Sequence, residues 1–303
     1  MRHRYFTLDV FTDRVFGGNP LAVFPDARGI PVAQMQRAAR ELNLSETVFV
    51  LPPETAEGTR RLRIFTPGVE LPFAGHPTVG TAILLAMLGE VPLEGGEARI
   101  VFEEGVGPVP VNIRGRDGKP EFAELSAAML PESRPAPARE EIAALLGLSA
   151  DDVGSEGYDA EAVSCGVPFV IAPLRDLDAL GRARVDPAVW QRLLADAWAP
   201  HVYLFTPETG SAADFRVRMF APAMGIAEDP ATGGAASAFA GYLAMRDAAA
   251  DGSLRWTVEQ GMEMGRPSTL HLEADKSAGA VTAIRVGGSA VLVGEGWMEI
   301  PEG

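Results

Sequence analysis

The sequence predicts an α+β protein built from two pseudo-symmetric halves, each a β-barrel-like sheet wrapped around a buried central helix. Three observations lead to this prediction: a sequence pattern that recurs, two helical segments without charge, and many short strand candidates around them. The chain has 303 residues, of which 47% are hydrophobic and 22% are charged. A chain of that length and composition can bury a sizeable core and is typical of a globular protein.

The first observation is an internal repeat. The segment RLRIFTP at 61–67 recurs as RVRMFAP at 216–222. Residues 75–82 correspond to 228–235, and residues 18–23 to 166–171. Because three blocks recur in the same order about 150 residues further on, a spacing too long for a solenoid repeat, the chain is predicted to contain two copies of one domain.

The repeat sets the predicted domain boundaries. The first barrel-like half is expected over residues 1–130 and the second over 136–287. Between them lies Leu130–Pro137, which has three prolines in eight residues and is predicted to be a linker.

The second observation concerns the two predicted central helices. Neither Pro77–Leu88 nor Pro230–Met245 contains a charged residue. A helix that is apolar on every side is buried on every side, whereas a surface helix shows one polar face. A proline at the first helical position is predicted to set the start of each helix.

The third observation is a series of short segments with strand character. Those of the first copy are numerous enough to wrap one helix, and Pro110 predicts that the strand containing it lies at a sheet edge. In each copy a surface helix candidate, at 33–42 and at 187–198, precedes a strand, at 47–51 and at 202–205. The strand candidates of the first copy are 5–10, 21–24, 47–51, 62–65, 99–102, 109–113 and 121–125.

Composition excludes several classes of function. The chain carries a formal charge of −15, so its surface repels phosphate backbones and anionic lipids, and neither nucleic-acid nor membrane binding is expected. Its two lysines, Lys119 and Lys276, lie outside apolar runs, so neither suits a Schiff base with pyridoxal phosphate. The single cysteine, Cys165, rules out an internal disulfide, and the four scattered histidines indicate no metal site.

Targeting signals are not expected either. The first residues are MRHR, and Asp9 and Asp13 follow before any hydrophobic stretch develops, which does not fit a signal peptide. The longest stretch without formal charge, Leu71–Gly89, is broken by Pro72 and Pro77, and its helical part is too short to cross roughly 30 Å of hydrocarbon. The sequence therefore predicts a soluble cytoplasmic protein.

The starts of the two central helices are the first place to look for a site. A helix N-terminus offers free backbone N–H groups and a partial positive charge, so it binds anions well. Gly80 in one helix, and Gly233 and Gly234 in the other, leave the backbone open to a ligand. Two equivalent helices are expected to direct these ends at a cleft between the halves. The same glycines equally fit close packing of a helix against a sheet.

Three ionisable residues near these helix starts are candidates for proton transfer. Asp229 is typical of an ordinary N-cap, an interpretation that local sequence favours over catalysis. His76 is a poor cap, and its ordinary pKa near 6.5 suits a proton carrier, although a simple hydrogen bond to a carbonyl is the commoner role. Glu46 precedes the hydrophobic strand TVFV, where apolar neighbours raise the pKa of a carboxyl, but a solvated turn glutamate fits the local sequence better.

Motifs for other chemistries are not found in the sequence. It contains no GxGxxG after a strand candidate, no GxxxxGK[ST] and no GxSxG, so nucleotide cofactors and serine hydrolase chemistry lack support. Carboxylates and a histidine at helix starts can move protons. Isomerisation by proton transfer is therefore the reaction class that the residues permit.

Five blocks, in order along the chain, resemble the PhzF family of phenazine-biosynthesis-type isomerases. They run from about residue 16 to about residue 268, and the strand candidates at both ends extend the similarity to nearly the whole chain. The blocks are FGGNPLAV at 16–23, LSET at 44–47, FTP at 65–67 with LPFAGHPT at 71–78, EDPATG at 228–233, and EQG at 259–261 with MGRPS at 264–268.

The resemblance implies the diaminopimelate-epimerase-like fold with the site between its halves, no cofactor, frequent homodimers and a small carboxylate-bearing substrate. It also implies that the C-terminal strand, around Val291–Ile300 within 288–303, returns to the first half. Glu46 is then the main proton-transfer residue, assisted by His76 and Asp229. The residues expected to bind substrate are Asn19, Gly75, Thr78, Gly233 and Gly234.

One departure from the family pattern keeps alternatives open. Where the family often reads DPATGS, this chain has Gly234 in place of the serine, so a hydroxyl that could bind substrate is missing. A metabolite-binding protein that has lost turnover is therefore one alternative to an isomerase. Another is an amino-acid epimerase that uses Glu46 against Asp229 or His76. Racemisation by two thiols is excluded, because the matched positions hold His76 and Asp229 and the chain has one cysteine.

Overall fold

The structure is a computed structural model that describes residues 1–302. By its internal contacts the chain divides into two compact units. One unit comprises Met1–Ser126 together with the chain from Gly287 onward, and the other comprises Ala127–Val286. That each half, 1–130 and 136–287, is a separate domain stays a prediction.

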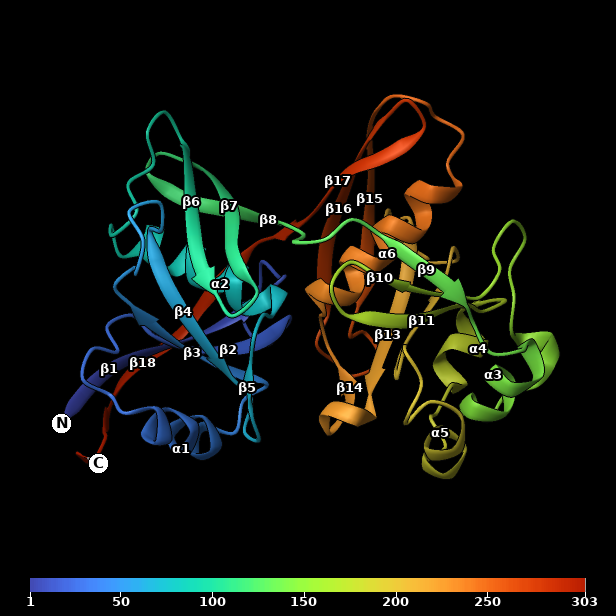
Figure 1. Ribbon diagram of the computed structural model, residues 1–303, viewed down its shortest axis with the longest axis horizontal. Coiled ribbons are helices and arrows are strands. Elements are labelled where there is room, and N and C mark those ends of the chain that lie inside the picture. Colours follow the sequence, from blue (N-terminus) through green and yellow to red (C-terminus); the bar gives the residue numbers. More distant parts are fainter. Residues whose placement is uncertain (303) are drawn as a thin grey trace. The chain divides into compact units, whose positions relative to one another are not determined.

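The first unit is a mixed sheet around one helix (Figure 1). Its strands lie in the order β18-β1-β2-β3-β4-β6-β7-β8, in which β2 is parallel to β3 and β4 is parallel to β6, while the other neighbours are antiparallel. The short β5 pairs with β4. The strands are β1 Arg2–Val10, β2 Asn19–Phe24, β3 Glu46–Leu51, β4 Arg60–Phe65, β5 Glu70–Leu71, β6 Glu97–Glu104, β7 Gly107–Arg116, β8 Lys119–Ser126 and β18 Ala290–Glu299.

The second unit repeats this arrangement. Its strands lie in the order β9-β10-β11-β12-β13-β15-β16, with β11 parallel to β12 and β13 parallel to β15. The short β14 pairs with β13, as β5 does with β4. The strands are β9 Glu132–Pro135, β10 Glu161–Ser164, β11 Pro168–Pro173, β12 His201–Thr206, β13 Phe215–Ala221, β14 Ile226–Asp229, β15 Gly252–Gln260, β16 Ser268–Ser277 and β17 Ala280–Gly288. The predicted α+β class and the pseudo-symmetry are confirmed.

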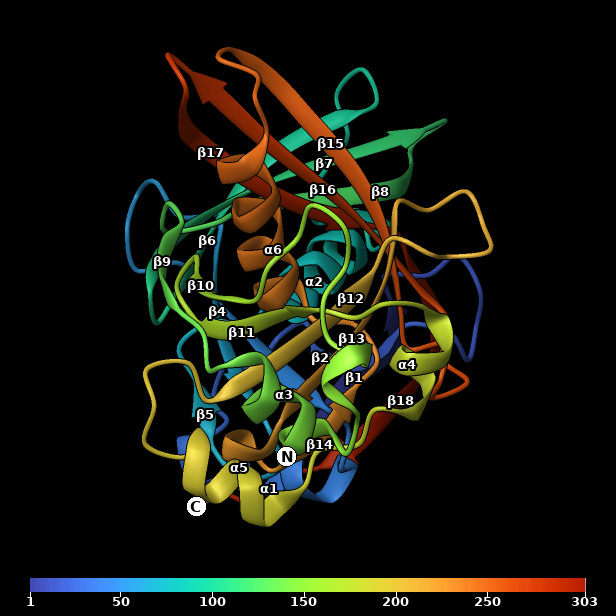
Figure 2. The same ribbon diagram turned by 90° about the vertical axis from the view of Figure 1, so that its right-hand side faces the viewer.

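Each unit holds one central helix. Helix α2, Gly75–Met87, lies inside the sheet of the first unit, and all of its residues except Met87 are buried. Helix α6, Gly233–Arg246, lies against β10, β11 and β16 of the second unit (Figure 2). Both helices are buried along most of their length, as their uncharged sequences predict. No helix within residues 1–302 combines the length and the apolar character needed to cross a membrane.

The remaining helices cover other parts of the sheets. Helix α1, Val32–Leu42, packs against Phe24, Phe49 and Phe65 on the sheet of the first unit. Three short helices form a core with β11 and β12 of the second unit: α3 Arg139–Leu146, α4 Leu177–Arg182 and α5 Pro187–Leu193. Two single 3₁₀ turns complete the helices, η1 Ala150–Asp152 and η2 Pro222–Met224.

The predicted starts of both central helices are wrong. Helix α2 begins at Gly75, two residues before Pro77, because the first turn of a helix has no intrahelical partner for its N–H groups and therefore tolerates proline. Helix α6 begins at Gly233, three residues after Pro230. There, the Thr232 amide donates to the side chain of Gln260 at 3.2 Å, an interaction from a distant strand that local sequence does not reveal.

Three further expectations are corrected. The predicted linker, Leu130–Pro137, contains β9, which pairs with β10. The strand that contains Pro110 is no edge strand, since β7 lies between β6 and β8. Its pairing with β8 begins at Val111, however, so the proline lies beyond the paired stretch on that side. The helix expected over 187–198 ends at Leu193.

Glycines at positive φ close several turns. In the hairpin between β7 and β8, Asp117 and Gly118 have φ of 52° and 73°, the signature of a type I′ turn. Gly18, just before β2, has φ of 59°, and a Cβ there would lie 2.3 Å from the carbonyl oxygen of Val10. A Cβ on Gly118 would meet no atom within 4 Å.

These two glycines provide a matched test of close approach. We expect Gly118→Ala to lower the free energy of unfolding by about 1 kcal/mol, the cost of a left-handed alanine. Gly18→Ala adds a clash with backbone to the same φ penalty, so its loss is expected to exceed that of Gly118→Ala by roughly 2 kcal/mol or more. Urea unfolding of both variants measures the difference, and equal losses would contradict this explanation.

Candidate active site

Glu46 opens strand β3 and is buried. It pairs in register with Leu21 on the parallel neighbour β2, so both side chains project from the same face of the sheet. A Cβ on Gly80 of helix α2 would lie 2.7 Å from Leu21 Cδ2, so this face is turned toward the central helix. Glu46 is 7% exposed. Its interpretation as a solvated turn glutamate is therefore wrong.

His76 lies in the first turn of α2 and contacts Glu46. The His76 Nε2 and Glu46 Oε2 atoms are 3.1 Å apart, and their side chains are 5% and 9% exposed. The strand start and the helix start thus bring an imidazole and a carboxyl together away from water. The imidazole therefore has an acid at contact distance.

Burial decides the charge of this imidazole. It lowers the pKa of His76 to about 3, since no bulk water solvates the cationic form. At neutral pH His76 is therefore a neutral ring with one N–H and one bare nitrogen. The 3.1 Å contact therefore places an uncharged ring beside the Glu46 carboxyl.

The first turn of α2 carries further predicted site residues. Gly75 is its first residue and Thr78 its fourth, and both are buried. The Thr78 hydroxyl lies 2.7 Å from an oxygen of Glu104, at the end of β6. Gly80, one turn along, packs tightly: a Cβ there would lie 2.6 Å from Val10 Cγ2. For this glycine the packing interpretation therefore holds.

Asn19 is also buried, at the start of β2. It pairs with Val10 at the end of β1, two residues before the Leu21 and Glu46 pair. The structure thus brings Asn19, Glu46 and His76 to one end of the sheet in the first unit. A role for Asn19 in substrate binding stays a prediction.

Asp229, Gly233 and Gly234 belong to the second unit. The N-cap interpretation of Asp229 is wrong, because it ends strand β14 and Thr232 is the N-cap of α6. An Asp229 oxygen accepts from the Thr232 hydroxyl at 2.5 Å, and the Gln260 side chain donates to the Asp229 carbonyl at 2.8 Å. Asp229 is thus fixed beside the start of α6. That it acts in one site with Glu46 and His76 stays a prediction.

The two glycines at the start of α6 differ in their surroundings. Gly233 is buried, whereas Gly234 is partly exposed, and a Cβ on Gly234 would meet nothing within 4 Å. The N-cap Thr232 makes no side-chain capping bond to the helix. The backbone at Gly234 is therefore accessible, in contrast to the tightly packed Gly80.

Cys165 has no features of a catalytic thiol. It is buried, and its Sγ donates to the carbonyl of Ser237 at 3.3 Å. Burial raises its pKa to about 12, so the thiolate form is negligible at neutral pH.

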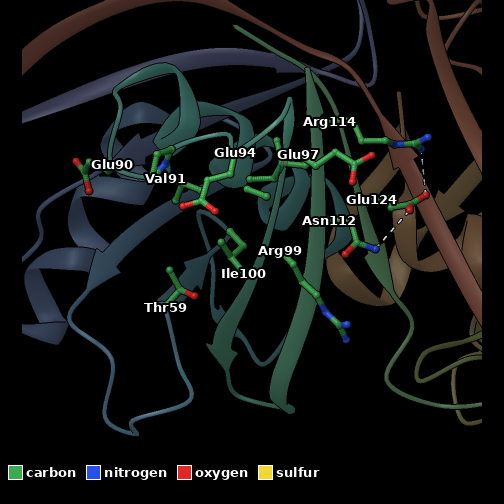
Figure 3. Close-up of a pocket in the computed structure, with 13 residues that line it drawn as sticks. Thr59, Glu90, Val91, Glu94, Glu97, Arg99, Ile100, Asn112, Arg114 and Glu124 are labelled. Carbon is green, nitrogen blue, oxygen red and sulfur yellow. Dashed lines mark hydrogen bonds and ion pairs between the residues drawn. The ribbon is translucent and has the colours of Figure 1, made fainter. Parts of the chain in front are cut away.

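Two hollows elsewhere on the first unit are lined by none of the predicted site residues. One of about 840 Å³ lies along β6 and β7 (Figure 3). There, Glu124 accepts from Asn112 and Arg114, each at 3.5 Å. Among residues 1–302 no group of three or more His, Cys, Asp or Glu side chains is placed to hold a metal ion.

Two polar residues near these positions were missed by sequence reasoning. Gln260, at the end of β15, donates to Asp229 and to the Thr232 hydroxyl, a pairing between segments far apart in sequence that no local pattern indicates. Glu104 could have been found from strand alternation. Ile100 and Phe102 are four and two residues before it, so all three project from the same, buried face.

The buried His76 predicts a loss of stability in acid. Its folded pKa of about 3 lies below the ordinary value of 6.5, so between these pH values the unfolded chain binds more protons and stability falls as pH falls. On going from pH 7.5 to 4.5 we expect the free energy of unfolding of His76→Gln to fall by about 2.5 kcal/mol less than that of the wild type. Urea unfolding at both pH values measures this. His271→Gln, at an exposed position, should behave as the wild type; the same behaviour from His76→Gln would contradict a neutral buried imidazole.

Comparison with known proteins relates this arrangement to a family. A family model described as phenazine biosynthesis-like protein matches residues 8–296. Over 298 residues the chain is 45% identical to an uncharacterized isomerase of Mesorhizobium japonicum, covering 96% of this chain and 97% of that protein. It is 38% identical over 298 residues to trans-2,3-dihydro-3-hydroxyanthranilate isomerase of Pseudomonas aeruginosa, covering 97% and 98%.

Solved structures agree with these matches. The crystal structure of a Bacillus anthracis phenazine biosynthesis protein of the PhzF family aligns with a TM-score of 0.88 at 29% identity, covering 99% of this chain and 100% of that one. Epimerases of far lower identity share the fold alone, which is the diaminopimelate-epimerase-like fold. Taken together with the full-length relatives, these matches establish that the chain belongs to the PhzF family of phenazine biosynthesis-like isomerases.

Proposed function

We propose that this chain is a cofactor-independent isomerase that moves a proton between carbon atoms of a small carboxylate-bearing metabolite. One observation carries the proposal: the contact of 3.1 Å between the buried side chains of Glu46 and His76. A cytoplasmic location and a homodimer remain predictions alongside it.

In the proposed reaction Glu46 is the main base. As a carboxylate it takes a proton from a carbon beside an unsaturated group, and the electron pair shifts along the conjugated system. Glu46 or the adjacent His76 then returns the proton to a different carbon, so that the substrate is neither oxidised nor reduced. Burial supports this assignment, because in a site without bulk water the Glu46 carboxyl and the ring face the substrate and not solvent.

A neutral His76 suits the second step. Burial lowers its pKa to about 3, so the ring stays uncharged beside Glu46 and can donate its own N–H to a group in the site. A histidine with an ordinary pKa would be partly charged near pH 6.5, and its cation would hold Glu46 in an ion pair instead.

The second unit is proposed to hold the substrate. The start of α6 offers backbone N–H groups at Gly233 and Gly234 without a side-chain cap, a setting that favours a carboxylate. Asp229 is proposed to assist proton transfer or to orient the substrate. Its bond with Thr232 supports this role, since it fixes the carboxyl at the end of β14.

The name of one relative suggests the first substrate to test. The Pseudomonas aeruginosa enzyme is a trans-2,3-dihydro-3-hydroxyanthranilate isomerase, and that compound has a carboxylate on a partly unsaturated ring. We propose this acid, or one of similar size and conjugation, as the substrate class. Gly234, in place of the serine expected from the family pattern, is the position where the preference of this chain is expected to differ.

Deuterium incorporation tests the role of Glu46. We expect the wild type, incubated with trans-2,3-dihydro-3-hydroxyanthranilate in heavy water, to place deuterium on carbon of the product. Glu46→Gln should lower the rate at least about 100-fold, since an amide cannot accept the proton. Mass spectrometry of the product measures both.

The matched control is Glu41→Gln, which makes the same change at an exposed glutamate of α1. It is expected to leave the rate unchanged. Equal deuterium uptake by the wild type and Glu46→Gln would end the role assigned to Glu46.

The glycine at 234 allows a second test. A serine Cβ there meets no atom within 4 Å, so we expect Gly234→Ser to unfold at the same urea concentration as the wild type, within experimental error. If the chain is an active isomerase with its own preference, Gly234→Ser should change the ratio of kcat/KM between candidate acids. Turnover that appears only in Gly234→Ser would instead identify the natural chain as a binding protein.

A further inference from the structure

The segment from Pro72 to Thr78, which carries His76, is held at both ends by the end of β6 and the turn into β7. At its front end, the Val106 amide donates to the Pro72 carbonyl at 3.1 Å. At its rear end, Thr78 Oγ1 lies 2.7 Å from Glu104 Oε1. Glu104 and Val106 belong to the end of β6 and the turn into β7, so the two contacts act together on the segment from Pro72 to Thr78.

The packing of this turn is close. A Cβ on Gly105, between the two contact residues, would lie 2.7 Å from Pro72 Cα. Movement of the turn therefore moves the segment in front of helix α2. The N-cap residue of α2 is Ala74, which has no side chain able to cap the helix.

The Thr78 hydroxyl has two acceptors within reach and one hydrogen to donate. Thr78 Oγ1 lies 2.8 Å from the Ala74 carbonyl oxygen and 2.7 Å from Glu104 Oε1. A hydroxyl has one hydrogen, and a carbonyl oxygen can only accept. If the Thr78 hydrogen goes to Ala74, the bond to Glu104 needs a hydrogen on the Glu104 carboxyl, which is then a neutral acid.

The other oxygen of Glu104 supports the neutral form. Oε2 is buried and has no hydrogen-bond partner among the described residues. A carboxylate in that position would have a charged oxygen with neither water nor a donor, which is costly. A protonated carboxyl carries much less charge on that oxygen.

Among residues 1–302 no ion pair with Glu104 is found. Helix α2 contributes His76, whose own pKa is lowered by burial. Burial raises the pKa of Glu104, the Thr78 bond lowers it, and no cation is among the causes. The charged residues on the adjacent β4, β5 and β7 do not pair with Glu104. Arg116 lies at the far end of β7. The others pair elsewhere: Arg60 with Glu90, Arg61 with Glu54, Arg63 with Glu70, and Arg114 with Glu124.

We propose that Glu104 is a positioning residue for His76. As a neutral carboxylic acid it donates to Thr78, and together with the turn that follows, it fixes the segment that presents the imidazole to Glu46. It is not a catalytic residue, because it acts through Thr78. The expected effect of Glu104 on kcat rests on the proposed function.

The consequence is a loss of activity in alkali. Burial raises the pKa of Glu104 to about 8. Above that pH the carboxylate has no proton to donate, both Thr78 acceptors compete for one hydrogen, and the contact with Thr78 changes. We therefore expect kcat of the wild type to fall about tenfold between pH 7 and pH 9, following the protonated fraction of one acid with that pKa.

Glu104→Gln is the decisive variant. The amide keeps the shape of the side chain and can donate N–H to Thr78, but it cannot ionise. We expect it to retain kcat at pH 7 within about twofold and to abolish the alkaline fall. Glu103→Gln is the matched control: Glu103 is the preceding residue, its side chain binds the amides of Glu54 and Thr55, and its variant should keep the fall of the wild type.

A second measurement does not depend on turnover. The infrared difference between wild type and Glu104→Gln should show a protonated carboxylic acid at pH 7 that ionises near pH 8. The ¹⁵N signals of the His76 ring should move over the same pH range in the wild type and stay constant in Glu104→Gln. A carboxylate band at pH 7, or His76 signals that ignore the ionisation of Glu104, would overturn the inference. Absence of turnover with every acid tested would count against the proposed function, and the infrared and NMR results would still decide this one.

Discussion

Burial of two helices that are apolar on every side is the constraint from which the rest of the structure follows. Helix α2 cannot face water on any side, so the strands of its unit must surround it. The same holds for α6 in the second unit, where the strands pair in the same order. The chain meets the same requirement twice with the same succession of parallel and antiparallel pairs.

The constraint also produces the chemistry of the first unit. A helix that starts inside a sheet brings its first turn against the ends of the strands, and there His76 meets Glu46. Because the surroundings are dry, ionisable groups keep their neutral forms: the pKa of His76 falls to about 3 and that of Glu104 rises to about 8. One cause, burial, thus acts in opposite directions on a base and on an acid.

Much of this could be predicted from the sequence. The charge-free stretches identified both central helices, and the repeated RLRIFTP and RVRMFAP blocks identified β4 and β13 as equivalent strands. Glu46 and His76 were singled out, but local sequence favoured a solvated Glu46. Its burial comes from pairing with Leu21 and from helix α2, and neither lies nearby in the sequence.

The starts of the helices and the contacts between distant segments were harder to predict. Proline is acceptable throughout the first turn of a helix, so Pro77 could not mark the start of α2. Asp229 looked like a cap, and only the long-range bonds of Gln260 explain why the helix starts later. Glu104 follows another glutamate near a glycine-rich turn, a pattern typical of a solvated loop. Its alternation with Ile100 and Phe102 was the available signal.

The buried Cys165 has a practical consequence. A thiol that is protonated and enclosed reacts slowly with alkylating reagents and oxidants, so the native chain offers almost no background for sulfhydryl labelling. A cysteine introduced at an exposed position would then be the sole fast-reacting nucleophile of its type. Fluorophores or spin labels could be attached to either unit without first replacing the natural residue.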